Sequence, residues 1–427
     1  MAIAKSRGRT KSIEPLFIGR LPVEMETLKF VFTSSFYPPY HLGGDANHVR
    51  YLAEELVNRG HEVHVLHSLD AYRAKRKGTP ARSGSHGVIT HPIETRFELS
   101  AYEAYVFGNS RRVIKKFRDL VHDVAPDVVH HHQISLLGYK ILERQGRYSN
   151  LYSAHDYWLI CPTSNLFKNG KEICEKPSCT ICGLYYKRPP QLWRRQSRFE
   201  DAIKGIDIFI ASSEYARETF ARRLSVRQVV IPNFVPYPPS EIQSSGFSNF
   251  FLFVGLLEKH KGAPQLIEVF KGIAKRKDAD LIIVGSGSLD SKIRRQIQES
   301  GLKDRILLFN WMELDSIYRL LKDSTALIIP SVWPENCPLI ALQALSVGTP
   351  VIGSKKGGVP EIVEKLNPRL LYESNAGLAE ILDSFEPYST DLVKQVYQKY
   401  YSPGVFISKY LDLVNSSALR IQESHKA

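Results

Sequence analysis

The chain has 427 residues, of which 43% are hydrophobic, and it contains no run of eighteen apolar residues. Such a chain is too long for one ordinary hydrophobic core and has no stretch long enough to span a membrane, so we expect a globular protein of two domains. Residues 1–28 form a polar, basic extension without the apolar centre of a secretory signal, which predicts a cytosolic location. Structural disulfides are then not expected.

The net charge of +13 is concentrated in the first half of the chain. Residues 1–235 carry 35 Lys and Arg against 23 Asp and Glu, whereas residues 236–427 carry 22 against 21. A basic half fits nucleic acid, an anionic membrane surface or a phosphorylated substrate, and charge alone does not choose among them. Because no nucleic-acid reader motif or set of interleaved aromatic residues accompanies the charge, we do not expect a nucleic-acid partner.

Short apolar runs alternate with amphipathic stretches along the first half, which is the pattern of a parallel sheet covered by helices. The loop 37–45 and a helix over 46–60 follow the first apolar run. A proline-rich segment, 236–249, interrupts the pattern and predicts a linker. Strands are expected at 29–36, 61–68, 127–132, 151–156, 207–213 and 228–233.

The second half repeats this rhythm, with strands expected at 250–257, 280–287, 305–311, 325–331 and 350–354. The sequence therefore predicts an α/β protein of two doubly wound, Rossmann-like domains that face each other across a cleft. They comprise residues 29–235, with a cysteine-rich insert at 161–183, and residues 250–400. A helix within 401–427 is expected to pack back on the first domain. Ligands of such sheets bind at the carboxyl ends of the strands.

The stretch WPENCPLIALQALSVGTP places Glu335 and Gln343 eight positions apart around a predicted helix over 338–347. Pro338 suits the first turn of this helix and Gly348 its end. The free N–H groups at the helix entrance favour an anion such as a diphosphate, with one polar side chain on either side of it. The alternative is that Glu335 caps the helix and Gln343 bonds to a neighbouring loop.

The stretch VGLLEKHKGAPQLIEVF is typical of a strand, a loop and a helix, and Lys261 lies in the loop. An ammonium group is thereby expected at the carboxyl edge of the second sheet, where a phosphate would bind. A lone lysine is, however, more often simply solvated.

In this order, VGLLEKHKG, IIVGSG, PENCPLIALQAL and GTPVIGSKKGGVPEIV resemble the retaining nucleotide-sugar transferases of glycosyltransferase family 4, which have the two-domain GT-B fold. The stretch FYPPYHLGGDANHVRYLAEELVNRGHEVHVL is similar to the opening strand, glycine loop and helix of that family, and SAHDYW to its histidine motif. The resemblance spans residues 29–415, and the ordered set is specific where each motif alone is weak.

The resemblance implies three catalytic residues: His155 beside the reacting sugar, Lys261 at the diphosphate, and Glu335 at the sugar hydroxyls. Gln343 matches the second acid of the Glu-x7-Glu signature, which grips the ribose. His155 is otherwise typical of a core histidine at a strand end. The donor-binding residues implied in this way are Gly43, Gly44, Gly255, Lys261, Gly285, Glu335, Asn336, Cys337, Pro338, Leu339 and Gln343.

Two positions depart from the family pattern. Leu256 stands where the family has an arginine at the leaving phosphate, and Gln343 removes a negative charge from the donor site. A glutamine still accepts a hydrogen bond from a ribose hydroxyl. The loss of the arginine has a larger effect, because positive charge at the leaving diphosphate usually stabilises the transition state strongly. Either a residue such as Lys259 replaces the arginine or the enzyme is slow or inactive.

Four cysteines, Cys161, Cys174, Cys179 and Cys182, lie in the insert 161–183. Four thiols in one short segment of a cytosolic protein favour a structural zinc site. Free thiols, and disulfides or a redox role, stay open as alternatives because C-x12-C-x4-C is not a standard zinc-ribbon spacing.

A predicted helix within 108–124 carries Arg111, Arg112, Lys115 and Lys116. Such a run is by default a solvated face. Together with the charge excess of the first half, it also predicts contact with an anionic membrane surface or a lipid-linked acceptor, and so a peripheral position on the cytoplasmic face of the membrane.

The sequence and the resemblance together predict a retaining glycosyltransferase that moves a sugar from a nucleoside-diphosphate sugar to a glycan or polyprenyl-diphosphate-linked acceptor. Synthesis of a cell-surface polysaccharide or glycolipid is the expected context. No cofactor is expected for catalysis. The alternatives are a nucleotide-sugar epimerase of the same fold and a family member that has lost its chemistry.

Overall fold

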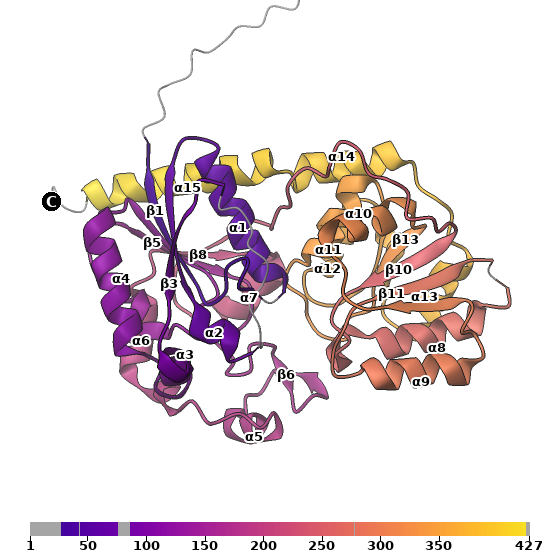
Figure 1. The fold of residues 1–427 in the computed structure, drawn as a ribbon, viewed down its shortest axis with the longest axis horizontal. Coiled ribbons are helices and arrows are strands. Elements are labelled where there is room, and N and C mark those ends of the chain that lie inside the picture. Colours follow the sequence, from indigo (N-terminus) through magenta and orange to yellow (C-terminus); the bar gives the residue numbers. More distant parts are fainter. Residues whose placement is uncertain (1–26, 42, 76–85, 277, 424–427) are drawn as a thin grey trace, which may run out of the picture.

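The computed structural model describes residues 27–41, 43–75, 86–276 and 278–423. The predicted extension 1–28 therefore lies almost wholly outside the described residues. The chain forms two α/β domains side by side, and the C-terminal helices run across both of them (Figure 1).

The first domain is built on a seven-stranded sheet in which all neighbouring strands are parallel. The order changes direction at the first strand, whose Phe30 is paired with Val63 on one side and with Val128 on the other. In spatial order the strands are β3 (Ile89–Ile93), β2 (Glu62–Ser68), β1 (Lys29–Ser34), β4 (Val128–His131), β5 (Ser149–Ala154), β8 (Ile208–Ala211) and β9 (Gln228–Val230).

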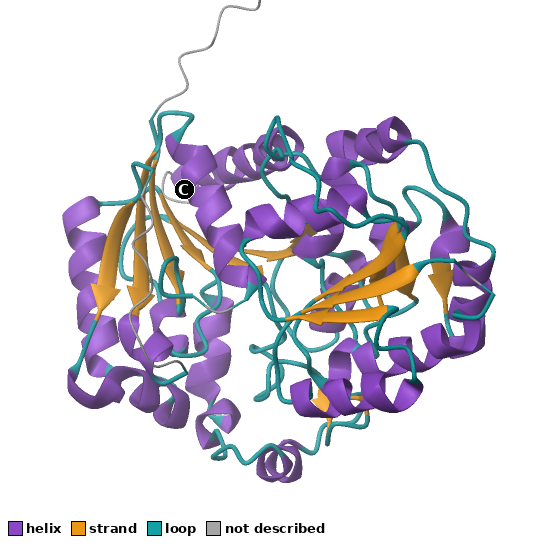
Figure 2. Cartoon of the chain, turned by 45° about the vertical axis from the view of Figure 1, so that its right-hand side comes forward, coloured by secondary structure: helices purple, strands orange, loops and turns teal. Residues whose placement is uncertain are grey.

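Helices lie on both faces of this sheet (Figure 2). A two-stranded hairpin of β6 (Phe167–Lys168) and β7 (Glu172–Ile173) lies in the cysteine-rich insert. The helical elements are α1 (Gly44–Val57), α2 (Leu69–Arg73), η1 (Arg96–Glu98), α3 (Leu99–Phe107), α4 (Arg111–Val124), η2 (Tyr139–Leu142), α5 (Cys179–Tyr185), η3 (Leu192–Arg195), α6 (Ser197–Lys204) and α7 (Glu214–Ala221).

The second domain contains a six-stranded parallel sheet in the order β12 (Ile306–Phe309), β11 (Asp280–Val284), β10 (Phe250–Val254), β13 (Ala326–Ile329), β14 (Val351–Ser354) and β15 (Leu371–Tyr372). Both sheets have the reversal at their first strand that defines a doubly wound fold. The helical elements are η4 (Lys259–Lys261), α8 (Ala263–Ile273), α9 (Asp290–Ser300), α10 (Leu314–Asp323), α11 (Leu339–Val347), α12 (Val359–Val363), η5 (Pro368–Leu370) and α13 (Asn375–Asp383).

The apolar runs that predicted the strands are buried on both sides. Phe30, Phe32 and Leu252 have no solvent exposure, because helices cover both faces of each sheet. The strand β3 has no such run and was not predicted. It is an edge strand with mostly exposed side chains and contains Pro92, a residue that a central strand excludes.

The predicted linker 236–249 has no helix or strand, and Asp323 holds it through hydrogen bonds from Ser244 and Ser245. The second domain is followed by α14 (Thr390–Tyr400) and α15 (Pro403–Glu423). The Tyr410 hydroxyl of α15 lies 2.9 Å from Nδ1 of His130 in β4, so this helix packs on the first domain. Among the described helices, none combines the length and the apolar character needed to cross a membrane.

Candidate active site

The carboxylate of Glu335 is the centre of a polar cluster in the loop between β13 and α11. Its Oε1 atom lies 2.6 Å from Lys261 Nζ, and it accepts hydrogen bonds from Ser331 Oγ at 2.6 Å and Trp333 Nε1 at 2.9 Å. Lys261 comes from η4, directly after β10, which neighbours β13 in the sheet. The fold therefore brings together two of the predicted catalytic residues at the carboxyl edge of the second sheet.

Glu335 is ionised in this environment. Burial by itself raises the pKa of Glu335, but the charge of Lys261 and the hydrogen bonds from Lys261, Ser331 and Trp333 outweigh burial and lower this pKa below its ordinary value. The Lys261 ammonium also lies 5.3 Å from the centre of the Trp333 ring. The site thus holds a fixed carboxylate acceptor next to a fixed cation.

Gly358 shapes the backbone around Glu335. The amide of Gly358 donates to the Glu335 carbonyl at 2.7 Å. A Cβ atom added to Gly358 would lie 1.9 Å from the carbonyl oxygen of Asn336 and 2.7 Å from Cβ of Ser213 in the first domain. Only glycine allows this approach, so the loop before α12 presses directly on the predicted donor-binding segment.

The N-termini of two helices, one from each domain, meet at this segment. Pro338 precedes the first residue of α11, and Leu339 lies against the start of α1: a Cβ atom on Gly44 would be 3.5 Å from Leu339 Cδ1. Gly43 has a φ of 79° and occupies the N-cap of α1. Unpaired N–H groups and the positive ends of two helix dipoles therefore converge, an arrangement that favours an anion.

Hydrogen bonds join the domains at the same place. Asn336 Nδ2 donates to the His155 carbonyl at 3.0 Å, and Asn233 Nδ2 donates to the Cys337 carbonyl at 3.0 Å. Glu361 of α12 accepts from the backbone N–H groups of Glu214 and Tyr215 at the start of α7. The predicted site residues of the second domain thus contact the loop that carries His155.

His155 belongs to a buried cluster of histidine rings. Its Nε2 lies 3.0 Å from His132 Nδ1, the two rings are stacked, and the His48 ring is 5.3 Å away. Burial lowers the pKa of His155 to about 4, so the ring is neutral at physiological pH. A neutral imidazole polarises a hydroxyl or accepts a proton, but carries no charge of its own.

Two carboxyl groups near the site were not predicted. Burial, followed by the charge of Asp156, raises the pKa of Asp45 to about 7, while Lys261 acts in the opposite direction and Glu335 adds to the rise. Burial raises the pKa of Asp156 to about 6. Asp45 directly follows the glycine pair 43–44, and Asp156 directly follows His155. Their position next to these motifs is the feature of the sequence that could have indicated them as site residues.

Other predicted donor residues lie around this centre. A Cβ atom on Gly285 would lie 1.9 Å from the Gly255 carbonyl oxygen, so the ends of β10 and β11 approach closely. Gln343 is buried within α11 and interacts with the Tyr51 hydroxyl of α1 in the first domain. Leu256, at the position of the family arginine, is 48% exposed. Lys259 of η4 is also exposed.

The predicted zinc site in the insert is not supported. Cys161, Cys174, Cys179 and Cys182 are free thiols that line one small cavity of about 20 Å³. Within the described part of the chain, however, no three His, Cys, Asp or Glu side chains are placed to hold one metal ion. The last two thiols, Cys179 and Cys182, lie in the first turn of α5.

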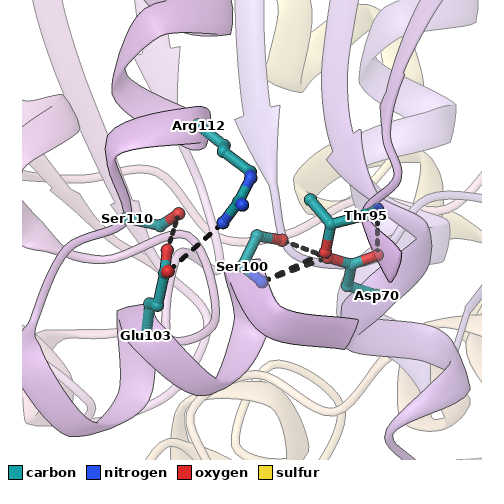
Figure 3. Close-up of polar contacts among 6 residues, drawn as sticks. All are labelled: Asp70, Thr95, Ser100, Glu103, Ser110 and Arg112. Carbon is teal, nitrogen blue, oxygen red and sulfur yellow. Dashed lines mark hydrogen bonds and ion pairs between the residues drawn. The ribbon is translucent and has the colours of Figure 1, made fainter. Parts of the chain in front are cut away.

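The predicted basic helix is α4, and its basic side chains are exposed. Arg112 Nη1 lies 3.3 Å from Glu103 Oε1, and Lys115 is paired with Asp119 at 2.6 Å (Figure 3 shows the Arg112 contact). The apolar face, with Val113 and Phe117, is buried. A role of Arg111, Arg112, Lys115 and Lys116 toward a membrane or acceptor stays a prediction.

Two Rossmann-like domains that meet over a carboxylate, a lysine and two helix N-termini define the GT-B class of glycosyltransferases. Residues 42–237 match the family described as Glycosyltransferase Family 4, and residues 240–397 match the family described as Glycosyl transferases group 1. The two matches cover one domain each. The chain therefore belongs to the glycosyltransferases of the family 4 type and is an enzyme, as the sequence predicted.

Relatives of similar length support this assignment. A glycosyltransferase of Methanocaldococcus jannaschii is 24% identical over 87% of this chain and 94% of its own length. A 42.6 kDa protein from the cps region of Klebsiella pneumoniae is 22% identical over 88% of this chain and its full length, 100%. An amylovoran biosynthesis glycosyltransferase of Erwinia amylovora is 28% identical over 34% of this chain and 38% of its own.

Solved structures share the fold. The lipopolysaccharide outer core galactosyltransferase WaaB matches with a TM-score of 0.60 and 17% identity, covering 91% of this chain and 99% of that one. The Anabaena protein HepE, in complex with UDP and glucose, matches with a TM-score of 0.59 and 16% identity over 93% and 99%. These likenesses confirm the predicted two-domain GT-B architecture.

Proposed function

We propose that the protein transfers a sugar, with retention of anomeric configuration, from a nucleoside-diphosphate sugar to a glycan or lipid-linked acceptor in the synthesis of a cell-surface polysaccharide or glycolipid. The observation that carries the proposal is the Lys261–Glu335 pair at 2.6 Å beside the converging starts of α1 and α11. A nucleotide-sugar donor needs a hydrogen-bond acceptor for its sugar hydroxyls and, next to it, positive charge for its diphosphate. Glu335 offers the first and Lys261 the second.

Each site residue takes a role in this proposal. Glu335 accepts hydrogen bonds from the hydroxyls of the donor sugar. Lys261 and the amides entering α11 bind the diphosphate, and Gln343 accepts from the ribose. Support for a nucleotide donor comes from HepE, whose structures contain UDP or UDP-glucose. Relatives named for the cps region and for amylovoran biosynthesis support the polysaccharide context.

The reaction breaks the bond between the anomeric carbon and the diphosphate oxygen, and forms a bond from the acceptor oxygen on the same face. The leaving phosphate oxygen takes the proton of the acceptor hydroxyl, so atoms and charge balance. Lys261 and the two helix N-termini stabilise the negative charge that develops on the diphosphate. Positive charge develops on the donor sugar as the diphosphate leaves. The neutral His155 ring polarises a hydroxyl of this sugar.

A peripheral position on the cytoplasmic membrane face is part of the proposal. The support is the charge excess of the first half and the exposed basic face of α4. Anionic headgroups attract such a face by about 1 kcal/mol per Lys or Arg near the surface.

The test is a thermal-shift screen of nucleoside diphosphates and their sugars, followed by transfer assays with the donor that stabilises the protein most. In the wild type, the sugar nucleotide should raise the melting temperature more than the free nucleoside diphosphate does. In Glu335→Gln this difference should disappear. Equal stabilisation of wild type and variant by the sugar nucleotide would contradict the site assignment. Incubation with the donor alone distinguishes an epimerase, which would convert the donor sugar without an acceptor.

A further inference from the structure

A second cavity lies in the first domain, away from the Lys261–Glu335 pair. It has a volume of about 380 Å³ and is formed by the cysteine-rich insert, α5, η3 and the loop after β5. Figure 1 shows α5 at the lower end of the first domain, beside β6. The loop after β5 carries His155 and continues directly to Leu159 and Ile160, which line the cavity. The cavity is therefore connected in sequence to the proposed reaction site.

The lining of this cavity is strongly cationic. It includes Arg188, Arg194, Arg195 and Arg223, and no aspartate or glutamate occurs among the described residues that line it. In the part of the chain that the structure describes, none of the four forms an ion pair. All four donate to neutral oxygens instead. For Arg188, Arg195 and Arg223 these are the Thr163 carbonyl, Thr180 Oγ1 and the Ile160 carbonyl.

Arg194 is held in a fixed position at the base of the cavity. Its guanidinium stacks against the rings of Trp158, Trp193 and Phe199 at 4.6 to 5.5 Å, and it donates to Gln191 Oε1 and the Leu159 carbonyl. The remaining nitrogen, Nη2, is shielded from solvent and has no hydrogen-bond partner among the described residues. A buried guanidinium N–H without an acceptor is costly unless a ligand supplies one.

The charge of Arg194 is retained at physiological pH. Burial lowers the pKa of Arg194 to about 10, and nearby Cys161, Cys179, Tyr152 and Asp156 favour its charged form. Asp156 has a raised pKa of about 6 and forms no ion pair with Arg194 within the described chain. The cavity therefore keeps the positive charge of Arg194, which no ion pair within the described chain neutralises, although the charge of Asp156 lies near it.

The elements that line the cavity also expose apolar side chains, termed the apolar rim. Thr180 and Gly183 of α5 line the cavity, whereas Ile181, Leu184 and Tyr185 of the same helix are 65%, 67% and 52% exposed. Leu192 of η3 lines the cavity and is itself 63% exposed. Exposed apolar side chains concentrated on one short element indicate contact with an apolar partner.

The adjacent helix α3 extends this apolar rim from a rigid base. Its Tyr105 lines the cavity, and its Tyr102 and Phe107 are 61% and 60% exposed. Figure 3 shows that the buried Asp70 carboxylate accepts hydrogen bonds from Thr95 and from the backbone and hydroxyl of Ser100 at the start of α3. The exposed aromatic rings are thus presented from a fixed helix rather than from a loose loop.

We propose that this cavity binds the phosphate or diphosphate head of a lipid-linked acceptor, with the lipid chain emerging past the apolar rim into the membrane. Arginines match phosphate oxygens through paired N–H donors, and the apolar side chains match an acyl or prenyl chain. The acceptor sugar then extends along the loop 155–160 toward the donor. The inference rests on the proposed function, since it assigns the acceptor of the same transfer reaction.

The test measures binding of the full-length protein to phosphatidylcholine vesicles with and without a long-chain prenyl diphosphate. The cavity variant is Arg195→Gln/Arg223→Gln, and its matched control is Arg198→Gln/Arg222→Gln, which removes the same charge from neighbouring exposed residues outside the cavity lining. We expect the prenyl diphosphate to tighten binding, the cavity variant to lose about tenfold or more of that gain, and the control to keep it. Equal losses in both variants would overturn the proposal, as would no loss in either.

A second pair of variants separates a lipid from a soluble phosphate source. Leu184→Ser in the rim should weaken binding to the prenyl-diphosphate vesicles but leave the affinity for inorganic diphosphate unchanged, with Leu392→Ser on α14 as the exposed control. If Leu184→Ser has no effect on vesicle binding, the occupant is a soluble phosphate and the lipid assignment is wrong. Thermal shifts with nucleoside diphosphates report on the donor site independently, so failure here does not count against the proposed transfer reaction.

Discussion

Lys261 Nζ and Glu335 Oε1 lie 2.6 Å apart, although 74 residues separate them in the chain. The glutamate side chain is 9% exposed and the lysine side chain 22%. The pair joins the loop after β10 to the loop before α11. It therefore fixes the ammonium group and the carboxylate of the proposed nucleotide-sugar site in one geometry. Because the partners differ in burial, their removal should have unequal consequences.

Lys261→Met should lower transfer by about 100- to 1000-fold, because the diphosphate loses its fixed cation. It should also destabilise the fold by about 3–5 kcal/mol at neutral pH, because it leaves the buried Glu335 charge unpaired. Glu335→Gln should lower transfer similarly but cost less stability, since an amide keeps hydrogen bonds to Ser331 and Trp333. Initial rates measure the loss of transfer, and urea unfolding measures the loss of stability. The control is Lys271→Met, which changes an exposed lysine of α8.

The stability effect of Lys261→Met should depend on pH in a defined direction. In the wild type the pKa of Glu335 lies below its ordinary value, so the pair contributes stability that is complete above about pH 4.3 and is lost as the pH falls through the folded pKa. The difference in unfolding free energy between wild type and variant should therefore shrink on acidification. It should begin to shrink above about pH 4.3, where the buried and unpaired carboxyl of the variant takes up a proton, and continue to shrink as the pH falls through the folded pKa of the wild type. A difference that grew at low pH would show that the lysine acts through packing instead.

Leu256→Arg should restore the second cation of the family pattern. Leu256 is 48% exposed, so the change should leave the unfolding free energy within about 0.5 kcal/mol. Affinity for a nucleoside diphosphate should rise by up to about tenfold, since one charge-assisted contact is added. Leu392→Arg on α14, also 48% exposed, is the matched control for added surface charge. Equal gains in both variants would mean that general charge, not position 256, is responsible.

Gly358→Ala should disrupt the site by displacing the backbone that carries its residues. The new methyl group would lie 1.9 Å from the Asn336 carbonyl oxygen, so the segment that carries Glu335 and Asn336 must move. Overpacking of this kind costs about 1–3 kcal/mol and should lower donor affinity as well. Gly404→Ala in α15, where a Cβ atom meets nothing within 4 Å, should leave donor affinity unchanged. Thermal unfolding with and without nucleotide distinguishes the two.

The histidine cluster should make the protein sensitive to acid. The pKa values of His48, His130, His132 and His155 are lowered by burial, so the unfolded chain binds more protons than the native state below about pH 6.5. Stability is therefore lost as the pH falls from about 6.5 toward 4. In His155→Gln that slope should fall by up to about 1.4 kcal/mol per pH unit, whereas His122→Gln, on the exposed face of α4, should leave it unchanged.

The architecture was largely readable from the sequence because both sheets are buried on both faces. Burial on both faces requires continuous apolar runs, and such runs mark central strands such as β1 and β10 whatever the partner strands are. Edge strands escape this rule: β3 contains Pro92 and exposes most of its side chains. The approach of Lys261 to Glu335 also followed from the motif order, since both lie at the carboxyl ends of neighbouring parallel strands.

Only the tertiary structure determined the properties that depend on distant neighbours. Burial by distant segments lowers the pKa of His155, and burial together with the charge of Asp156 raises the pKa of Asp45, which no local spacing reveals. The zinc prediction found no support, because cysteine spacing does not specify how distant thiols are placed relative to one another in the described fold. The cavity around Arg194 is a similar case: the sequence shows its arginines as charge, but only the packed structure shows that no described Asp or Glu side chain lines the cavity with them. Sequence patterns fix which faces are buried; charge pairing across the fold is settled only when distant segments pack together.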